Sequence, residues 1–416
     1  MGENSRESNE CVETLKIAIL AFACDPSSGT EAGLGWNWAQ AYAESGNHVR
    51  VFTHETQKEN FELSHGYSGI NVVFLRTKLL KSPKAPTHLG EMVSMTRLYR
   101  SWLKAVHKEL RTSEYDLIHH VSWSTARIKS PVVSMGSKGV WGPIGGGHLA
   151  KISRIPLRDK LYEFFRNLSV ILSPFWISED QPKSDSTLVL TTNDETKELM
   201  NRSGFRFVKP ELADGISADW LKSSSKSLHP VKIRLFWAGR LVPSKRPDLA
   251  IQLLKMLIRE GIDCELRVAG VGNQALALRK LVQRLELGQY VTFLNHLGRE
   301  EIRQNIDSCD FVLFTSFRDS SSPIILEGAA RGTPSIAIRN QGVKSMYPED
   351  VAIGPTGNQS LKKILNKMKV DIVYLKSNPK EYEKRSRASL EFAKSQLWVT
   401  KVRRVISLHS NRGEFD

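Results

Sequence analysis

The 416-residue sequence lacks the features that mark membrane-spanning and secreted proteins. It contains no run of 18 consecutive apolar residues, so we expect no helix that crosses a bilayer. The first ten residues, MGENSRESNE, are polar and charged and do not resemble the apolar core of a secretory signal. Only four cysteines occur, and their wide spacing fits neither a disulfide framework nor a metal site. We therefore expect a cytoplasmic protein.

Two common ligand-binding motifs are also missing. The segment GTEAGLG, residues 29–35, follows the first predicted strand but lacks the GxGxxG spacing of a dinucleotide-binding loop. No acidic residue closes the next predicted strand, where a dinucleotide ribose would bind, so a nicotinamide-dependent enzyme is disfavoured. The chain has no Asp-x-Asp motif, and neither a divalent metal nor another cofactor is implied.

What the sequence has in excess is positive charge. It contains 59 Lys and Arg against 44 Asp and Glu, a formal net charge of +15. Such a charge attracts nucleic acids, anionic lipid headgroups or phosphorylated substrates, but no nucleic-acid-binding motif accompanies it. Residues 76–111 and 151–172 combine basic with aromatic side chains. Each stretch is either a solvated helix face above a core stripe or a surface that binds a membrane or an acceptor.

Short apolar runs alternate with helical patterns along the chain, which is typical of doubly wound α/β domains. The first run, residues 15–20, is almost continuously apolar, as in a parallel strand buried on both faces. Ser, Lys, Gly and Pro accumulate around residues 216–231, which we interpret as a linker. The pattern predicts two Rossmann-like domains, residues 14–215 and 232–385, after a polar tail of residues 1–13.

Two cationic residues follow a predicted strand that ends at Gly239. Open α/β sheets bind ligands at the carboxyl ends of their strands, and Arg240 and Lys245 lie at such an end. An arginine fork and a lysine point charge one loop turn apart suit a diphosphate held from two sides. Basic residues also occur in such loops for solvation alone, so this pair does not identify a ligand by itself.

An acidic and hydroxyl-rich segment follows a later predicted strand. Here FRDSSSPIILEGAARG, residues 317–332, places Asp319 and Glu327 eight residues apart. Ser322 is expected to cap a helix that begins at Pro323, and the helix amides with the three serine hydroxyls would form an anion site. Glu327 lies about one turn into this helix, where it could accept hydrogen bonds from a sugar diol. The alternative makes Asp319 a turn former and Glu327 a solvent-facing residue.

Three segments in this half resemble the retaining GT-B glycosyltransferases of family 4, the glycosyl transferases group 1, and in particular their bacterial polysaccharide type. They are GRLVPSK (239–245), the stretch from VAGVGN to LNHL (268–297) and FTSFRDSSSPIILEGAARGTPSI (314–336). They occur in the family's order and spacing, and the resemblance extends over nearly the whole chain. It implies two Rossmann-like domains facing across a cleft, with a C-terminal helix, residues 386–416, returning to the N-terminal domain.

The resemblance also implies roles for individual residues. Arg240 and Lys245 would bind the donor diphosphate, Glu327 the ribose, and Asp319 with the serine amides the donor sugar; these four are the expected catalytic residues. The nucleobase would lie between two turns, and the first glycine segment would face the phosphates from the other domain. The expected donor-binding residues are Gly29, Gly33, Gly239, Gly270, Gly272, His296, Leu297, Ser320, Ser321, Ser322, Pro323 and Ile324.

The chain departs from the family pattern at two positions. The family usually has Glu where this chain has Asp319, one methylene shorter, and this change could alter sugar choice or weaken turnover. Many members carry a second His at the position of Val121, after the one that corresponds to His119. We consider His119, His120 and the more distant His148 as replacements, with a structural role for a strand-end histidine as the alternative.

The turn WGPIGGGH, residues 141–148, is unusually rich in glycine. It resembles a WGP-GGG element of some bacterial polysaccharide transferases. It either lines the active cleft, where Gly146 and His148 would contact the sugar or the acceptor, or is a plain chain reversal.

The resemblance implies transfer of a sugar, with retention, from a UDP- or GDP-sugar to an acceptor hydroxyl in polysaccharide or glycolipid synthesis. The nucleotide sugar is a co-substrate, so no cofactor is expected, and nucleic acid is not an expected partner. A lipid-linked or polyanionic acceptor would fit the basic N-terminal half, on an anionic inner membrane face. The alternatives are a catalytically weakened protein that binds nucleotide sugars or polyanions, and a sugar-nucleotide epimerase or hydrolase.

Overall fold

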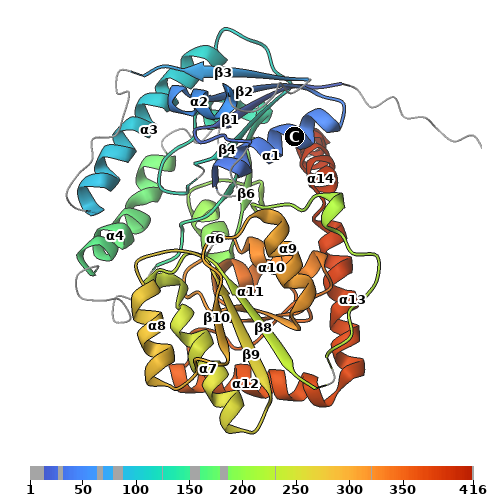
Figure 1. Cartoon of the computed structure of the whole chain (residues 1–416). Helices are drawn as coiled ribbons and strands as arrows, with labels where there is room; N and C mark the ends of the chain where they lie inside the picture. Colours follow the sequence, from blue (N-terminus) through green and yellow to red (C-terminus); the bar gives the residue numbers. More distant parts are fainter. Residues whose placement is uncertain are drawn as a thin grey trace, which may run out of the picture.

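The computed structural model describes most of the chain in two α/β domains (Figure 1). The residues that it describes are 14–26, 31–62, 69–77, 88–123, 125–149, 160–178, 186–229, 231–319 and 321–414. The predicted tail, residues 1–13, lies outside them.

The N-terminal domain is built on a seven-stranded parallel sheet in the order β3-β2-β1-β4-β5-β6-β7. Its strands are β1 (Lys16–Ala21), β2 (His48–His54), β3 (Ile70–Leu75), β4 (Leu117–Ser122), β5 (Gly139–Ile144), β6 (Leu188–Thr191) and β7 (Val208–Pro210). Its helices are α1 (Glu31–Glu44), α2 (Lys58–Glu62), α3 (His88–Leu110), α4 (Lys160–Ile177) and α6 (Asp194–Arg202), with 3-10 turns η1 (Glu55–Gln57) and η2 (Pro131–Lys138).

The C-terminal domain has a second parallel sheet, in the order β10-β9-β8-β11-β12-β13. Its strands are β8 (Ile233–Ala238), β9 (Cys264–Ala269), β10 (Val291–Phe293), β11 (Phe311–Phe314), β12 (Ser335–Ala337) and β13 (Ala352–Ile353). The helices are α7 (Pro247–Arg259), α8 (Ala275–Arg284), α9 (Arg299–Ser308), α10 (Pro323–Ala330), α11 (Gln341–Met346), α12 (Leu361–Ser377) and α13 (Pro379–Ser395), and the last helix of the chain, α14 (Trp398–Ser410), packs on the N-terminal domain. Turns η6 (Ala218–Trp220), η7 (Pro243–Lys245) and η8 (Asn411–Glu414) lie in the same part of the chain.

The two sheets have separate hydrophobic cores. In the N-terminal domain, Trp38, Trp102 and Trp141 are fully buried around the sheet. In the C-terminal domain, α7 buries Leu249 and Leu253 in the core that contains the β8 strand. Burying a leucine side chain contributes about 1.5–3 kcal/mol, so each core can stabilise its own domain. The domain limits at 216–231 stay a prediction.

The chain returns to the N-terminal domain through α14. Val402 and Val405 are buried in the core formed by β1 and α1, and the Trp398 ring lies edge-on to Trp38, with 5.4 Å between ring centroids. Figure 1 shows α13 along the lower domain and α14 beside α1. The returning helix therefore begins at Trp398, twelve residues after the expected start at 386. The predicted fold, two doubly wound domains with a C-terminal helix crossing back, is confirmed.

A buried ion pair fixes this return. The Lys401 ammonium is fully buried and forms an ion pair with Glu211, and it donates to the Leu212 carbonyl at 2.8 Å. Burial alone would raise the pKa of Glu211, but Lys401 and Arg404 outweigh burial and lower it. Glu211 follows β7, the last strand of the first sheet. The pair thus joins the crossover between the domains to the last helix.

Candidate active site

The predicted residues of the C-terminal domain lie at one edge of its sheet. Arg240 follows β8, Gly270 follows β9, His296 follows β10 and Asp319 follows β11. These strands are parallel and adjacent, so their carboxyl ends meet at the same edge. This is the edge at which open α/β sheets bind ligands.

Lys245 and Asp319 are in direct contact at this edge, where they form a half-buried ion pair. The loop that carries Lys245 is held by Thr315, whose hydroxyl lies 3.0 Å from the Lys245 carbonyl and 2.8 Å from that of Arg246. The indole of Trp237 donates to the same hydroxyl at 2.9 Å. The ends of β8 and β11 thereby fix the lysine and the aspartate relative to each other.

Arg240 adds a second cation beside this pair. Burial raises the pKa of Asp319, while Lys245 and then Arg240 act in the opposite direction. Arg240 itself is exposed. The structure therefore brings together one carboxylate and the two cations predicted to hold a diphosphate.

Glu327 lies on α10 among other carboxylates. Burial, with the nearby Asp214 charge, raises its pKa to about 7. Asp214 accepts a hydrogen bond from the Ser321 hydroxyl. Asp214 lies in the crossover between the domains and was not predicted, because its partner is 107 residues away in the sequence. The acidic residue in LADGIS carries no local signal of this contact.

The expected cap of α10 differs from the structure in its hydrogen bonding. Pro323 is the first helical residue, as predicted, and Ser322 precedes it. The Ser322 hydroxyl, however, makes no capping bond and is buried without a hydrogen-bond partner in the described part of the chain. The backbone carbonyl of Ser322 instead accepts a hydrogen bond from the Tyr347 hydroxyl at 3.1 Å. Ile324, the second residue of α10, is buried. Ser320 lies outside the described residues.

The two turns predicted to hold the nucleobase lie side by side. The Gly270 amide donates to the Asn295 carbonyl at 2.5 Å, next to the exposed His296 and half-buried Leu297. Gly270 has a φ of 130°, and a Cβ there would lie 1.9 Å from the Gly239 carbonyl oxygen. At the next turn, a Cβ on Gly272 would lie 2.4 Å from the Leu241 carbonyl oxygen. Close packing of loops thus explains these glycines, and contact with a base stays a prediction.

The glycine segment of the N-terminal domain is not the open loop that we expected. Helix α1 begins at Glu31, so Gly33 and Gly35 are helical, and Gly33 is buried. A Cβ on Gly35 would lie 2.7 Å from the Ala23 carbonyl oxygen, so the glycine permits α1 to pack closely on the end of β1. Gly29 lies outside the described residues.

His119 and His120 are core residues and not acceptor contacts, which corrects the functional expectation. Both are fully buried on β4, and burial lowers the pKa of each to about 3. His119 Nε2 donates to the Gly142 carbonyl at 2.7 Å, and Nδ1 accepts from the Tyr42 hydroxyl at 3.0 Å. His120 Nε2 lies 3.0 Å from the Tyr99 hydroxyl. Their nitrogens are therefore occupied within the domain.

His148 has a different environment, at the carboxyl end of the first sheet. It follows β5, two residues after Gly146, whose φ of 93° permits the turn. Arg166 on α4 donates to His148 Nε2 at 2.9 Å. Glu163 of the same helix forms ion pairs with Arg166 and with Arg318 of the C-terminal domain. Sequence reasoning missed these three residues, which connect the two domains beside Asp319.

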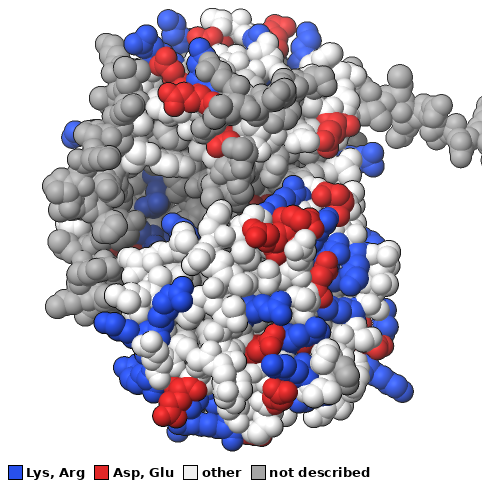
Figure 2. Space-filling view, viewed as in Figure 1, with Lys and Arg blue, Asp and Glu red and all other residues white. Residues whose placement is uncertain are grey.

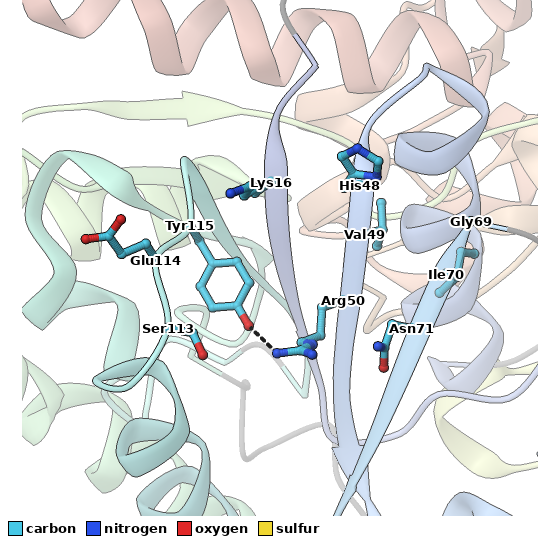
Figure 3. Close-up of a pocket in the computed structure, with 10 residues that line it drawn as sticks. All are labelled: Lys16, His48, Val49, Arg50, Gly69, Ile70, Asn71, Ser113, Glu114 and Tyr115. Carbon is cyan, nitrogen blue, oxygen red and sulfur yellow. Dashed lines mark hydrogen bonds between the residues drawn. The ribbon is translucent and has the colours of Figure 1, made fainter.

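The pocket in Figure 3 lies elsewhere. It encloses about 520 Å³ and is lined by Lys16, His48 and Ile70, the first residues of three strands. Tyr115 precedes β4 and accepts a hydrogen bond from Arg50 at 3.5 Å. The pocket is therefore at the amino edge of the first sheet, opposite to the predicted site. We assign it no role in the chemistry.

Comparison with known proteins gives one family match. Residues 222–386 match the model for glycosyl transferases group 1. Among curated relatives, D-inositol 3-phosphate glycosyltransferase of Pseudarthrobacter chlorophenolicus is 24% identical over 363 residues, which are 79% of this chain and 80% of the relative. The enzyme of the same name from Saccharomonospora viridis is 24% identical over 372 residues, 81% of each chain.

Solved structures share the fold. Sucrose-phosphate synthase from Thermosynechococcus elongatus superposes with a TM-score of 0.67 at 15% identity, over 96% of this chain and 100% of that one. WaaG, a glycosyltransferase of lipopolysaccharide biosynthesis, gives 0.60 at 13% identity, over 94% and 98%. HepE of Anabaena, solved with UDP and glucose, gives 0.59 at 15% identity, over 95% and 100%. These similarities show that the fold is GT-B.

Proposed function

We propose that this chain is a glycosyl transferase of group 1 that transfers a sugar from a UDP- or GDP-sugar to an acceptor hydroxyl with retention of configuration. The observation that carries the proposal is the grouping of Arg240, Lys245 and Asp319 at the carboxyl edge of the second sheet. Glu327 lies on the helix that follows the same loop.

The main barrier to such a transfer is the negative charge that develops on the leaving diphosphate. Arg240 and Lys245 are two fixed cations at the sheet edge, and the amino terminus of α10 at Pro323 adds its dipole. Lys245 is already paired with Asp319, so its position is set before the donor arrives. Because these groups can neutralise a diphosphate and the sequence has no Asp-x-Asp motif, we propose transfer without a divalent metal.

Retention is proposed to proceed by attack on the face that the diphosphate leaves. The bond from the anomeric carbon to the phosphate oxygen breaks while a bond to the acceptor oxygen forms. The acceptor proton passes to the leaving phosphate oxygen. No side chain is needed as a nucleophile, and Asp319, held by Lys245, is proposed to contact the donor sugar instead.

Nucleotide binding is proposed to depend on Glu327 as the acceptor for the two ribose hydroxyls. A carboxylate binds a diol better than a carboxylic acid does, so the raised pKa of this group links binding to pH. HepE was solved with UDP-glucose as well as with UDP, which makes a uridine nucleotide the first donor to test.

We propose that the acceptor belongs to polysaccharide or glycolipid synthesis and is used at a membrane surface. None of the described helices is long and apolar enough to cross a bilayer. Helix α4, however, buries Val170 and Ile177 together with the polar Glu163, Arg166 and Ser173 against the protein. Its exposed face carries Phe164, Phe165, Leu168, Ile171, Leu172, Phe175 and Trp176.

An apolar stripe of this kind suits the interface of a bilayer, where it removes apolar area from water. Figure 1 shows α4 and α3 on the same side of the molecule. The exposed side of α3 carries Arg97, Arg100 and Lys104, which favour anionic headgroups. The proposed occupant of the α4 face is therefore an anionic membrane surface.

Product analysis tests the reaction. The protein would be incubated with UDP-glucose or GDP-mannose and a membrane lipid extract, and the released nucleotide, the sugar and the lipid would be analysed. A sugar found on the lipid, with nucleoside diphosphate released in equal amount, would support transfer. An isomerised donor would favour an epimerase, and free sugar would favour a hydrolase. A donor that binds but stays unchanged would favour a binding protein. The shorter side chain of Asp319 is the feature that favours the last.

A further inference from the structure

Five charged or polar side chains from both domains meet where the carboxyl edges of the two sheets face each other. Arg127 follows β4, His148 follows β5, and Glu163 and Arg166 lie on α4. Arg318 comes from the loop after β11 and is paired with Glu163 across the domains. We call these five residues the arginine cluster. Figure 2 shows a hollow between the upper and lower domains, with Lys and Arg side chains inside it.

The hydrogen bonding of His148 identifies what this cluster lacks. The Arg166 guanidinium can only donate, so His148 Nε2, 2.9 Å away, must accept. The proton of the neutral ring is therefore on Nδ1. Among the described residues this buried N–H group has no acceptor, and His148 is only 6% exposed. A buried donor without an acceptor is costly, and such groups are rare unless a ligand or water completes them.

The three guanidinium groups around His148 cannot supply that acceptor, because they are donors as well. Burial, followed by Arg166, Arg318 and Arg127, lowers the pKa of His148 to about 3, so all three guanidinium groups act on this ring. Glu163 is the carboxylate paired with two of them. Arg166 is 95% buried, and a buried guanidinium is a strong and geometrically specific donor to oxyanions.

The cluster is close to the donor site. Arg318 is adjacent in sequence to Asp319, whose side chain is paired with Lys245. Arg318 keeps 37% of its side chain exposed, so it can reach a ligand in the hollow. The loop that carries Arg318 thus also carries the residue proposed to contact the donor sugar.

We propose that the arginine cluster is a binding site for an anionic group, a phosphate ester or a carboxylate, on the acceptor. This inference rests on the proposed function, since it takes the reaction to be transfer to an acceptor. The anion would accept from the His148 Nδ1–H group and from the guanidinium of Arg318. Glu163 forms ion pairs with Arg166 and Arg318, and it would compete with the anion for them.

The test measures anion binding separately from nucleotide binding. The full chain is first saturated with UDP, and the rise in melting temperature reports the donor site. Calorimetry on this complex then compares D-inositol 3-phosphate with myo-inositol and glucuronate with glucose. We expect at least one anionic probe to bind at least about tenfold more tightly than its uncharged partner, as one or two charge-assisted hydrogen bonds would give. Equal binding within both pairs, or no binding of either anion, would overturn the proposal.

Three variants test the residues. Arg318→Gln is expected to weaken binding of the anionic probe about tenfold, while Arg303→Gln, with a similarly exposed side chain on α9, leaves it unchanged. Glu163→Gln is expected to tighten binding several-fold, because it removes the competing carboxylate. If the Glu163–Arg318 pair merely held the domains together, this substitution would weaken binding. Weaker binding by Glu163→Gln, or equal binding of the anionic probe by the two arginine variants, would contradict the proposal. An unchanged rise in melting temperature with UDP would show that the donor site is intact in each variant.

Discussion

Lys245 and Asp319 form an ion pair between two loops that are 74 residues apart in the sequence. The pair sets the position of the lysine on the edge where Arg240 also lies. It also gives the buried Asp319 carboxylate a counter-ion before any donor binds. The shorter acid at this position is thus paired with a lysine of the neighbouring loop.

Arg240→Ala is expected to lower kcat by about 10²–10³-fold, because one of the two cations opposing the developing phosphate charge is removed. Arg240 is exposed, so the free energy of unfolding should change by no more than about 0.5 kcal/mol. Steady-state kinetics and urea unfolding measure the two quantities. Arg303→Ala, on α9, is the matched control. If Arg240→Ala turns over about as fast as this control, Arg240 does not belong to a diphosphate site.

UDP binding is expected to tighten as the pH rises through about 7. The pKa of Glu327 is raised to this value by burial and by Asp214, and the ionised form is the better acceptor for the ribose. Asp214→Asn removes one of the two causes, so the midpoint of the binding curve should move to lower pH. Calorimetric titrations between pH 5.5 and 8.5, in a range set around that pKa, would measure the shift. A midpoint that stays in place would show that Asp214 does not act on Glu327.

The exposed face of α4 is expected to bind anionic vesicles. Replacing Ile171 and Phe175, which are 56% and 77% exposed, by Ser should abolish flotation with phosphatidylglycerol vesicles without lowering the melting temperature. The control replaces Val370 and Tyr374 on α12, 51% and 52% exposed, in the same way. Binding should also need anionic lipid and weaken with salt. If the α4 and α12 double variants float with the vesicles to the same extent, the exposed face of α4 does not bind the membrane.

Lys401→Met is expected to destabilise the fold strongly, by about 3–5 kcal/mol, because it leaves the Glu211 carboxylate buried beside a single remaining cation, Arg404. Chemical unfolding followed by tryptophan fluorescence gives the change. Replacing Glu211 as well, by Gln, should recover part of the loss. A single variant as stable as the wild type would mean that the pair does not hold the returning helix.

Local patterns predicted the fold, and they also predicted that four of the candidate site residues follow strands of the second sheet. Short apolar runs marked the strands, and Arg240, Lys245, Asp319 and Glu327 follow strands whose carboxyl ends share one edge. The sequence could predict this grouping because parallel strands place the loops at their carboxyl ends along one edge of the sheet. The three segments that resemble the family lie in this domain as well.

Other features depend on contacts that no local pattern encodes. Asp214 meets Ser321, and Glu163 meets Arg318, across more than one hundred residues of sequence. The misassigned histidines have a simpler cause. β4 lies between β1 and β5, so side chains on both of its faces are buried, and two adjacent histidines are both core residues.

The most direct test of the account is thermal melting of the protein with a panel of nucleoside diphosphates and nucleotide sugars. A ligand that binds only the folded state raises the melting temperature by mass action. The account predicts a rise selective for one base, UDP or GDP, that is lost in Glu327→Ala and in Arg240→Ala. A well-folded wild-type protein that melts at the same temperature with every nucleotide would contradict a donor site at this edge.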